Sequence, residues 1–320
     1  MEPPDRGNVI LSEGQKLFKT DPVRLIWEVD MQSAEKYRES FLKGDTARDE
    51  GLTTPEDIVR TDDVSYGADA ALVTDIYRRS DMDGRNPTIV SVHGGAWVAG
   101  SKTTYQYYCM SLAQRGFTVV NCNYHMAPET QFPGSIADIN QLFAWIMANG
   151  AQYHIDTRNL FVVSDSSGAQ ITSQYAALLT NPEFQKLFPF TPPEGLALNA
   201  IALNCGVYDA KTYILTDADA PIHYYVGELT EEKLEAMNTM KYITSAFPPA
   251  YVVSSNRDFL RRNAQPMYEA LQALGVESRL QMFGTQERPL GHVFHLDIRC
   301  PEGIECSDNE TAFFRQFIVA

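Results

Sequence analysis

The stretch from Leu160 to Gln170 carries a serine between two segments whose apolar residues follow different periods. The run Leu160–Val163 is continuously apolar, which is typical of a strand covered on both faces. From Ile171 onward the apolar residues recur at helical spacing. Small residues occupy the junction, so Ser166 is predicted to lie at the apex of a sharp strand-to-helix turn that exposes its hydroxyl. Taken alone, the pattern fits a nucleophilic serine and an ordinary strand-loop-helix junction about equally well.

A second motif, His93-Gly94-Gly95, directly follows the apolar run Thr88–Val92. Glycines after a strand let backbone N–H groups turn toward a ligand, because no Cβ atom stands in the way. Amides arranged in this way can stabilise an oxyanion, the negatively charged oxygen of a tetrahedral intermediate. Taken alone, the motif is better explained as a plain glycine turn, and it indicates chemistry only in combination with the serine.

A serine hydroxyl is a weak nucleophile and needs a base to take its proton. Histidine titrates near neutrality and can serve, provided that a carboxylate holds its second ring nitrogen. His292 comes after the last expected strand, and Asp258 comes after the strand before it. His295 is a second candidate for the base, and Asp297 and Glu287 are alternative acids, although neither of these two carboxylates follows a strand.

Strand-like runs alternate with helical patterns from residue 73 to the end of the chain. Such alternation predicts an α/β fold with a mostly parallel central sheet and helices on both faces. Ligands of such sheets bind beyond the carboxyl ends of the strands, so the polar motifs are expected at one edge. The expected strands are Val73–Tyr77, Thr88–Val92, Phe117–Cys122, Leu160–Val163, Leu198–Leu203, Pro249–Ser254 and Ser278–Phe283.

Helices are expected near 103–115 and 308–318, and along the apolar stripes Ile136–Ile146, Ile171–Leu178 and Met267–Leu274. Ser135 is predicted to cap the helix that carries the first of these stripes, with Asp138 in its first turn.

The 320 residues suit a single α/β domain. The segment 1–66 is polar and helix-prone, with an amphipathic helix expected near 31–43. Residues 206–245 are too many for a plain connection between two strands and are expected to form an insertion with a short helix near 231–238. Both segments are predicted to be cap elements over the active site.

The net charge of −15 argues against a nucleic-acid partner, because phosphate binding needs clustered lysines and arginines. The same charge disfavours an anionic membrane surface, and no apolar run is long enough to span a bilayer. The first residues lack the basic and apolar regions of a signal peptide. We therefore expect a cytoplasmic protein without stable membrane association.

The five cysteines are expected to be free thiols, which agrees with a reducing compartment. Cys300 and Cys306 are close enough in sequence to pair, but two free thiols in a loop are the favoured interpretation. No spacing of cysteines and histidines fits a zinc site, so no metal is expected.

Taken together, the motifs resemble those of α/β-hydrolases of the hormone-sensitive-lipase-like group of carboxylesterases. The resemblance covers residues from about 70 to the end of the chain. It implies an α/β-hydrolase fold and the hydrolysis of small or short-chain acyl esters through an acyl-enzyme, without a metal or organic cofactor. The matching segments are His93-Gly94-Gly95, Tyr124, Ala127-Pro128-Glu129, Phe132-Pro133, Asp138, Ser164 to Ala169, Asp258-Phe259-Leu260 and His292-Val293-Phe294.

By this resemblance Ser166 is the nucleophile, His292 the base and Asp258 the acid that orients it. The order of these residues along the chain is the one expected of an α/β-hydrolase. His292 is preferred over His295 because His-x-Phe after the last strand is the family pattern. The resemblance further implies an oxyanion hole, formed by the backbone amides of Gly94, Gly95 and Ser167.

The sequence leaves open questions at Trp97, Ser164 and Ala169. Trp97 either binds substrate in the acyl pocket or packs in the interior. Ser164 and Ala169 stand where the family usually has glycine, which puts the tightness of the serine turn in doubt.

Two other functions remain open from the sequence. The segment from His93 to Trp97 also resembles that of arylformamidases, which cleave an amide with the same serine chemistry. A ligand-binding receptor on the same fold is disfavoured, because all three candidate catalytic residues are present. The expected partner is a small-molecule ester, and a homodimer is possible without any specific feature in its favour.

Overall fold

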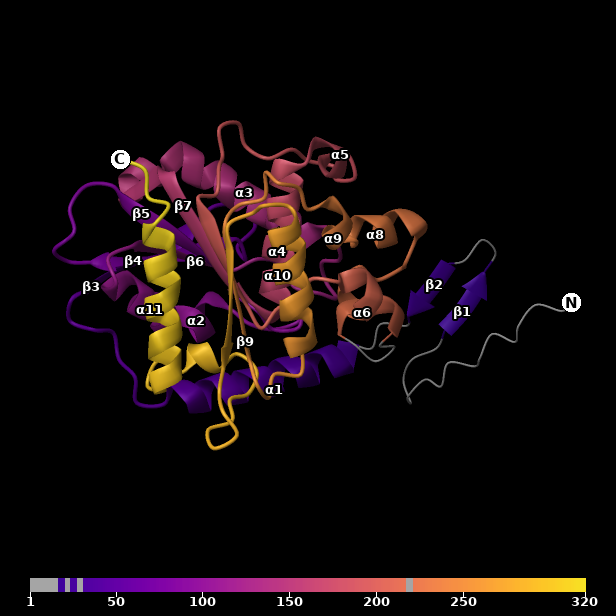
Figure 1. The fold of residues 1–320 in the computed structure, drawn as a ribbon, viewed down its shortest axis with the longest axis horizontal. Helices are drawn as coiled ribbons and strands as arrows, with labels where there is room; N and C mark the ends of the chain where they lie inside the picture. The colour runs from indigo at the N-terminus through magenta and orange to yellow at the C-terminus, as the bar shows by residue number, and fades with distance from the viewer. Residues whose placement is uncertain (1–16, 21–23, 28–30, 217–220) are drawn as a thin grey trace, which may run out of the picture.

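A computed structural model describes residues 17–20, 24–27, 31–216 and 221–320 (Figure 1). The central element is an eight-stranded sheet with the order β10-β9-β8-β7-β5-β6-β4-β3. A separate two-stranded hairpin pairs β1 (Leu17–Thr20) with β2 (Arg24–Trp27). The strands of the sheet are β3 (Ile58–Ser65), β4 (Val73–Arg79), β5 (Asn86–Val92), β6 (Thr118–Cys122), β7 (Ile155–Asp165), β8 (Ala200–Asn204), β9 (Ala250–Ser255) and β10 (Ser278–Phe283).

The sheet is parallel from β6 through β5, β7, β8 and β9 to β10, while at the other edge β4 pairs antiparallel with both β6 and β3. This confirms the expected mostly parallel sheet and every strand predicted from residue 73 onward, with small shifts at the ends. Strand β5 lies between β6 and β7, so the chain turns in opposite directions on its two sides. A crevice for ligands is expected at the carboxyl ends of such strands.

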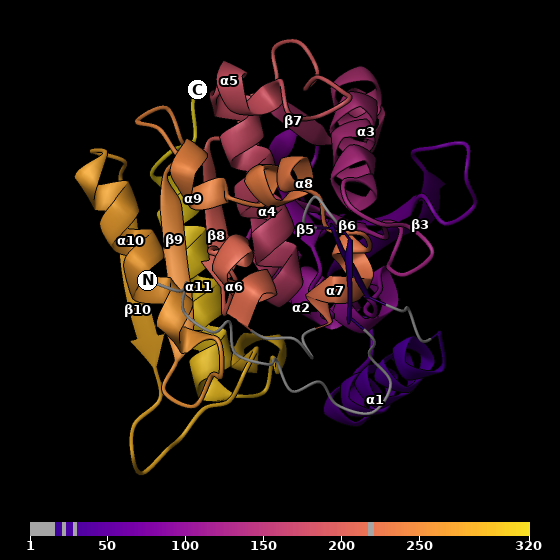
Figure 2. The ribbon, with the colours of Figure 1, turned by 90° about the vertical axis from the view of Figure 1, so that its right-hand side faces the viewer.

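Helices cover both faces of the sheet, as Figure 2 shows. Successive residues of β7 point to opposite faces, so that Phe161 and Val163 join one core cluster and Val162 joins the other. The first cluster includes α2 (Lys102–Gln114) and α11 (Pro301–Arg315), and the second includes α3 (Gly134–Asn149), α4 (Ser166–Thr180) and α10 (Ala264–Ala273).

The expected insertion between β8 and β9 consists of short helices. They are α6 (Ala210–Thr216), α7 (Ile222–Val226), α8 (Glu231–Ala236) and α9 (Thr239–Tyr242). The remaining helices are α1 (Met31–Asp49) and α5 (Pro182–Gln185), with single 3-10 turns at η1 (Gly150–Tyr153), η2 (Arg261–Asn263) and η3 (Phe294–Leu296).

The expected N-terminal arm of residues 1–66 ends earlier than predicted, because Ile58–Ser65 belongs to the sheet as β3. This strand lies at the edge of the sheet and pairs only with β4. Most of its side chains are exposed or half-buried, and Asp62 and Asp63 stand side by side in it. An edge strand needs few apolar residues, so it leaves no apolar run to recognise.

The predicted capping of α3 by Ser135 is wrong. The helix begins at Gly134, and Ser135 instead donates a hydrogen bond from its hydroxyl to the carbonyl of His125. Asp138 likewise serves the preceding loop, where it accepts hydrogen bonds from the backbone and the ring of His125 at 2.8 and 2.9 Å. Polar residues at the start of this helix therefore hold a loop rather than the helix end.

All five cysteines are free, as expected. In the part of the chain that the structure describes, the helices are all too short or too polar to cross a membrane.

Glu310 on α11 is a fully buried acid beneath the sheet. Its carboxylate accepts hydrogen bonds from Tyr108 Oη at 2.9 Å and from Asn204 Nδ2 at 2.6 Å. Burial, which is only partly offset by these two donors, raises the pKa of Glu310 from 4.5 to about 7. The folded protein therefore holds a proton that the unfolded chain releases between these two values.

We expect Glu310→Gln to stabilise the fold increasingly as the pH rises. The wild type should lose about 1.4 kcal/mol of unfolding free energy per pH unit between about 4.5 and about 7, whereas the glutamine variant has no proton to lose at this position. Urea unfolding at about pH 5 and about pH 8 should show the variant gaining on the order of 2 kcal/mol relative to the wild type.

The matched control is Glu305→Gln, which changes an exposed acid on the same helix. Its effect on the unfolding free energy should be small at both pH values. An equal effect of Glu310→Gln at both pH values would contradict the account of this buried carboxyl group.

Candidate active site

Ser166 lies at the junction of β7 and α4, where the chain turns sharply. Its backbone has a φ of 52°, in the left-handed region that non-glycine residues seldom adopt. Gly168 is required for this turn, because a Cβ atom there would lie 2.3 Å from the carbonyl oxygen of Val92 and 2.4 Å from that of His93. The turn is therefore packed directly against the end of β5.

The two substitutions for the usual glycines fit into this turn. Ser164 is buried, and its hydroxyl donates a hydrogen bond to the carbonyl of Ala202 on the neighbouring strand at 3.3 Å. Ala169 is completely buried within α4. Neither residue opens the turn, so the doubt that the sequence raised about its tightness is removed.

His292 joins the serine to a buried carboxylate. Its Nε2 atom lies 3.0 Å from Ser166 Oγ, and its Nδ1 atom lies 2.8 Å from Asp258 Oδ1. The structure thus brings together the three residues selected from the sequence, which lie in segments far apart along the chain. Phe259 covers the outer face of the imidazole, with ring centroids 4.4 Å apart.

Asp258 is fully buried and is held by hydrogen bonds on both carboxylate oxygens. The hydroxyl of Ser254 donates to Oδ2 at 2.8 Å, and the backbone amide of Leu260 donates to Oδ1 at 2.9 Å. Burial alone would raise the pKa of this carboxyl group, but the hydrogen bond and charge of His292, together with these donors, lower its pKa below the usual value. Asp258 therefore stays ionised and can orient the imidazole.

The alternatives for the base and the acid lie elsewhere. His295 is buried, and burial lowers its pKa to about 3. Asp297 pairs with Arg299 at 3.4 Å, and Glu287 is exposed.

The glycine turn after β5 is tied to the residue that precedes the serine. Tyr105 Oη accepts a hydrogen bond from the backbone amide of Gly94 at 3.0 Å and donates one to Asp165 Oδ2 at 2.9 Å. Asp165 is fully buried, and burial raises its pKa to about 7. The backbone amide of Gly94, one of the three donors expected from the sequence, is thus already engaged by Tyr105 in this structure.

The rest of the turn is equally constrained. Gly95 has a φ of 124°, and a Cβ atom there would lie 2.0 Å from the carbonyl oxygen of Ala99. His93 is buried and stacks on Tyr124, whose hydroxyl donates to the carbonyl of His93. Burial lowers the pKa of His93 to about 4, so a neutral imidazole anchors the loop.

Trp97 packs in the interior rather than at the catalytic cavity. It is buried, donates from Nε1 to Gln170 Oε1 at 3.0 Å, and contacts the rings of Tyr213 and Tyr225. Of the two roles that the sequence left open for this residue, the structure favours packing.

A small cavity of about 40 Å³ lies beside Ser166 and His292. Helix α1 supplies part of its wall through Phe41 and Asp45. Arg38 on the same helix holds α1 against the glycine turn, donating to the carbonyls of Val98 and Ala127 at 2.9 and 3.0 Å.

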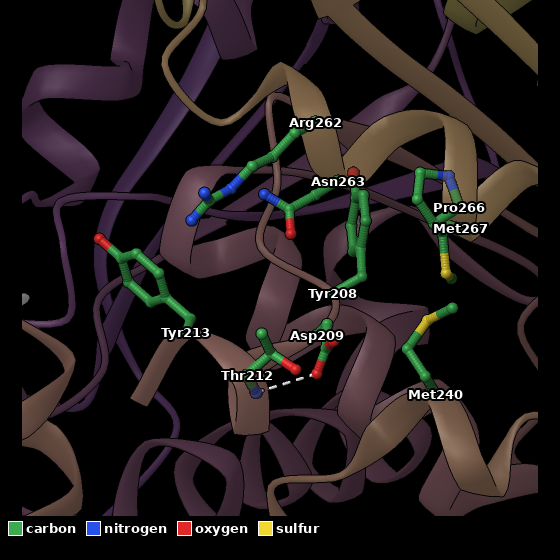
Figure 3. A pocket seen from close by; sticks show the side chains of 9 residues that line it. All are labelled: Tyr208, Asp209, Thr212, Tyr213, Met240, Arg262, Asn263, Pro266 and Met267. Carbon is green, nitrogen blue, oxygen red and sulfur yellow. Dashed lines mark hydrogen bonds between the residues drawn. The ribbon is translucent and has the colours of Figure 1, made fainter. Parts of the chain in front are cut away.

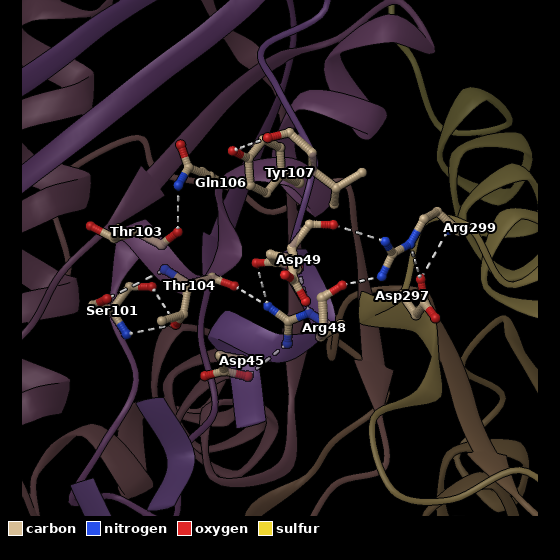
Figure 4. Close-up of polar contacts among 12 residues, drawn as sticks. Asp45, Arg48, Asp49, Ser101, Thr103, Thr104, Gln106, Tyr107, Asp297 and Arg299 are labelled. Atoms are coloured by element: carbon tan, nitrogen blue, oxygen red, sulfur yellow. Dashed lines mark hydrogen bonds and ion pairs between the residues drawn. The ribbon is translucent and has the colours of Figure 1, made fainter. Parts of the chain in front are cut away.

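Figure 4 shows how the end of α1 is fixed. The guanidinium of Arg48 pairs with Asp45 and Asp49 at 2.7 and 2.8 Å and donates to the carbonyl of Thr104 on α2. Arg299, which follows the histidine loop, donates to the carbonyls of Arg48 and Glu50. The N-terminal helix is therefore attached to both sides of the serine site.

Among the described residues, metal-type ligands converge at Cys205, Asp258 and His292, whose ligand atoms lie within 4.8 Å of one another. Two of these three side chains already share a hydrogen bond. The cluster therefore coincides with the serine site and is explained without an ion.

The polar role of Tyr105 was not identified from the sequence. The hydroxyl bonds to groups 11 and 60 residues away in the chain. No local pattern signals such a contact, although a tyrosine on the buried face of a helix is usually hydrogen-bonded.

The fold, the strained serine turn and the histidine-linked carboxylate are those of an α/β-hydrolase. A family model, BD-FAE, matches residues 74–268, more than half of the chain, and the chain belongs to this family. The expected likeness to hormone-sensitive-lipase-like esterases is thereby confirmed.

Curated relatives include esterase LipC and esterase LipQ of Mycobacterium tuberculosis. LipC is 27% identical over 73% of this chain and 59% of its own length, and LipQ is 28% identical over 64% of this chain and 51% of its own. The chain thus spans little more than half the length of these relatives. An inhibited esterase B from Lactobacillus rhamnosis shares the fold with a TM-score of 0.81, at 21% identity over 90% of this chain and 96% of that one.

We expect Tyr105→Phe to slow the reaction of Ser166 with a fluorophosphonate probe by about tenfold. The variant keeps the ring but removes the hydroxyl that accepts from the Gly94 amide and donates to Asp165. Each of these two hydrogen bonds contributes on the order of 1 kcal/mol to the stability of this arrangement. The glycine turn should then lose its fixed position relative to the serine.

Tyr108→Phe is the matched control, since Tyr108 lies on the same helix and also donates to a buried acid, Glu310. Both variants should lower the unfolding free energy, but only Tyr105→Phe should slow the labelling rate. Equal labelling rates in the two variants would refute a positioning role for Tyr105.

Proposed function

We propose that this protein hydrolyses carboxylic esters through an acyl-enzyme formed on Ser166. The observation that carries the proposal is the continuous hydrogen-bonded series from Asp258 through His292 to Ser166 Oγ. The names of LipC, LipQ and esterase B, which are all esterases, support the same chemistry.

In the first half-reaction Ser166 Oγ attacks the ester carbonyl while His292 Nε2 takes the serine proton. Asp258 holds Nδ1 of the imidazole and stabilises the positive charge that forms on it. When the tetrahedral intermediate collapses, the carbon–oxygen bond to the alcohol breaks and His292 returns the proton to the leaving oxygen. The acyl group remains on Ser166.

In the second half-reaction water takes the place of the alcohol. His292 removes a proton from the water as the water oxygen attacks the acyl carbon, and it then protonates Ser166 Oγ as the acid leaves. Atoms and charges balance with the protein's own residues and one water molecule.

The negative oxygen of both tetrahedral intermediates needs backbone donors. Of the three amides expected from the sequence, that of Gly94 is engaged by Tyr105. We assign this role to Gly95 and Ser167. Ser167 is the second residue of α4, where backbone amides have no acceptor within the helix.

The cavity beside Ser166 supports a preference for short acyl groups. Its volume is about 40 Å³, and Phe41 and Leu296 lie in its wall. A long acyl chain would have to displace α1, which Arg38 and Arg48 hold in place. With p-nitrophenyl esters, kcat/KM should therefore fall from butyrate to decanoate by at least about tenfold, because forcing extra methylene groups into a packed site costs about 1–3 kcal/mol.

We expect Asp258→Asn to lower kcat for p-nitrophenyl acetate by about 10³- to 10⁴-fold with little change in KM. The amide keeps the size of the side chain but removes the charge that holds the imidazole in its reactive tautomer. Circular dichroism would establish that the variant is folded.

Asp297→Asn is the matched control, because it neutralises the rejected candidate acid in the same region. Its kcat should remain within about twofold of the wild type. A large loss in Asp297→Asn with little loss in Asp258→Asn would overturn the assignment, and turnover of N-formylkynurenine but not of the esters would favour the arylformamidase alternative.

A further inference from the structure

A cavity of about 350 Å³ lies between the insertion after β8 and the segment after Asp258, as Figure 3 shows. One side is apolar, with the sulfur atoms of Met240 and Met267. On the opposite side the guanidinium of Arg262 and the amide of Asn263 turn toward Tyr213. An apolar cavity with a few convergent polar groups is the usual form of a small-molecule site.

The cavity is built from the same segments as the catalytic residues. Arg262 follows Asp258 by four residues, and Phe259 between them contacts the ring of His292. Tyr208 in the cavity wall is fully buried, and burial raises the pKa of its hydroxyl, with a smaller contribution from the charge of Asp258. The segment that supplies Arg262 and Asn263 to the cavity therefore also carries Asp258 and, through Phe259, contacts His292.

Arg262 has an unusual position among the cations of this region. Among the residues that the structure describes, no group accepts a hydrogen bond from its guanidinium. Its neighbour Arg261, by contrast, donates to the carbonyl of Asp258 at 3.3 Å. Asp209 also lines the cavity, but its carboxylate accepts from the backbone amide of Thr212 at 3.0 Å and forms no ion pair with Arg262.

A cavity of about 260 Å³ beside α1 lacks such a group. Arg38 in its wall is engaged by Glu129 and by two backbone carbonyls, and Asp45 is paired with Arg48. Of the two arginines that line these cavities in the described part of the chain, Arg262 in the cavity of about 350 Å³ is therefore the one without an acidic partner.

We propose that the larger cavity receives the alcohol part of the ester and that Arg262 selects alcohols that carry a carboxylate. The assignment follows from size, because the cavity of about 40 Å³ beside Ser166 has room only for a short acyl group. Met240 and Met267 would contact the carbon skeleton of the alcohol while Arg262 pairs with its anionic group. The inference rests on the ester hydrolysis proposed above.

The test compares 4-acetoxybenzoate with its neutral methyl ester, methyl 4-acetoxybenzoate, in the wild type and in Arg262→Gln. The acetyl group is the same in both compounds. For each protein, kcat/KM for 4-acetoxybenzoate is divided by kcat/KM for the methyl ester. Comparing this ratio between proteins cancels differences in leaving-group chemistry. Arg262→Gln should lower this ratio by about tenfold, mainly through KM, because the contact is remote from the reacting atoms.

Arg257→Gln is the matched control, since it removes the same charge from an exposed position of the same loop that does not line the cavity. Its ratio should equal that of the wild type. The difference between wild type and Arg262→Gln should also shrink as salt is raised from about 0.05 to about 0.5 M, because the guanidinium is exposed.

An unchanged ratio in Arg262→Gln would overturn the proposed selection, and so would an equal fall in Arg257→Gln. Failure of the folded wild type to hydrolyse either compound, with p-nitrophenyl acetate also inert, would instead refute the ester hydrolysis itself. The two failures are therefore distinguishable.

Discussion

The hydrogen bond between Asp258 and His292 is the interaction on which the rest of the site depends. A fully buried carboxylate is costly unless it is ionised and satisfied, and here three donors supply the compensation. Because both oxygens are fixed, the imidazole has one orientation, and its other nitrogen faces Ser166 at 3.0 Å. A reactive serine results only when all three side chains have these positions.

The parallel sheet supplies these positions. Ser166 follows β7, the glycine turn follows β5, and Asp258 follows β9, so each lies where a strand ends. The serine turn is possible only because Gly168 allows α4 to approach the end of β5. Tyr105 then connects the glycine turn to Asp165, so a second buried carboxylate links this turn to the residue that precedes Ser166.

Much of this arrangement could be predicted from the sequence. The buried strands are marked by continuous apolar runs, and the serine, aspartate and histidine each follow such a run or lie shortly after it. Parallel strands end at a common edge, so local patterns indicated that Ser166, Asp258 and His292 lie near one another. Their roles, and the choice of His292 over His295, came from the resemblance to carboxylesterases.

What could not be predicted depends on tertiary contacts or on exposed surfaces. Strand β3 is polar because it lies at an edge, and Ser135 and Asp138 bond to a loop that only the fold brings near. The engagement of the Gly94 amide by Tyr105 leaves no trace in local sequence, and neither does the unpaired state of Arg262.

The most direct test of the central claim is mass-spectrometric mapping of the fluorophosphonate adduct in the wild type and in Ser166→Ala. The account predicts one adduct, on Ser166, which is absent from the folded variant. A folded wild type without an adduct, or an adduct on another residue that persists in Ser166→Ala, would contradict the claim that the buried Asp258 and His292 activate this serine.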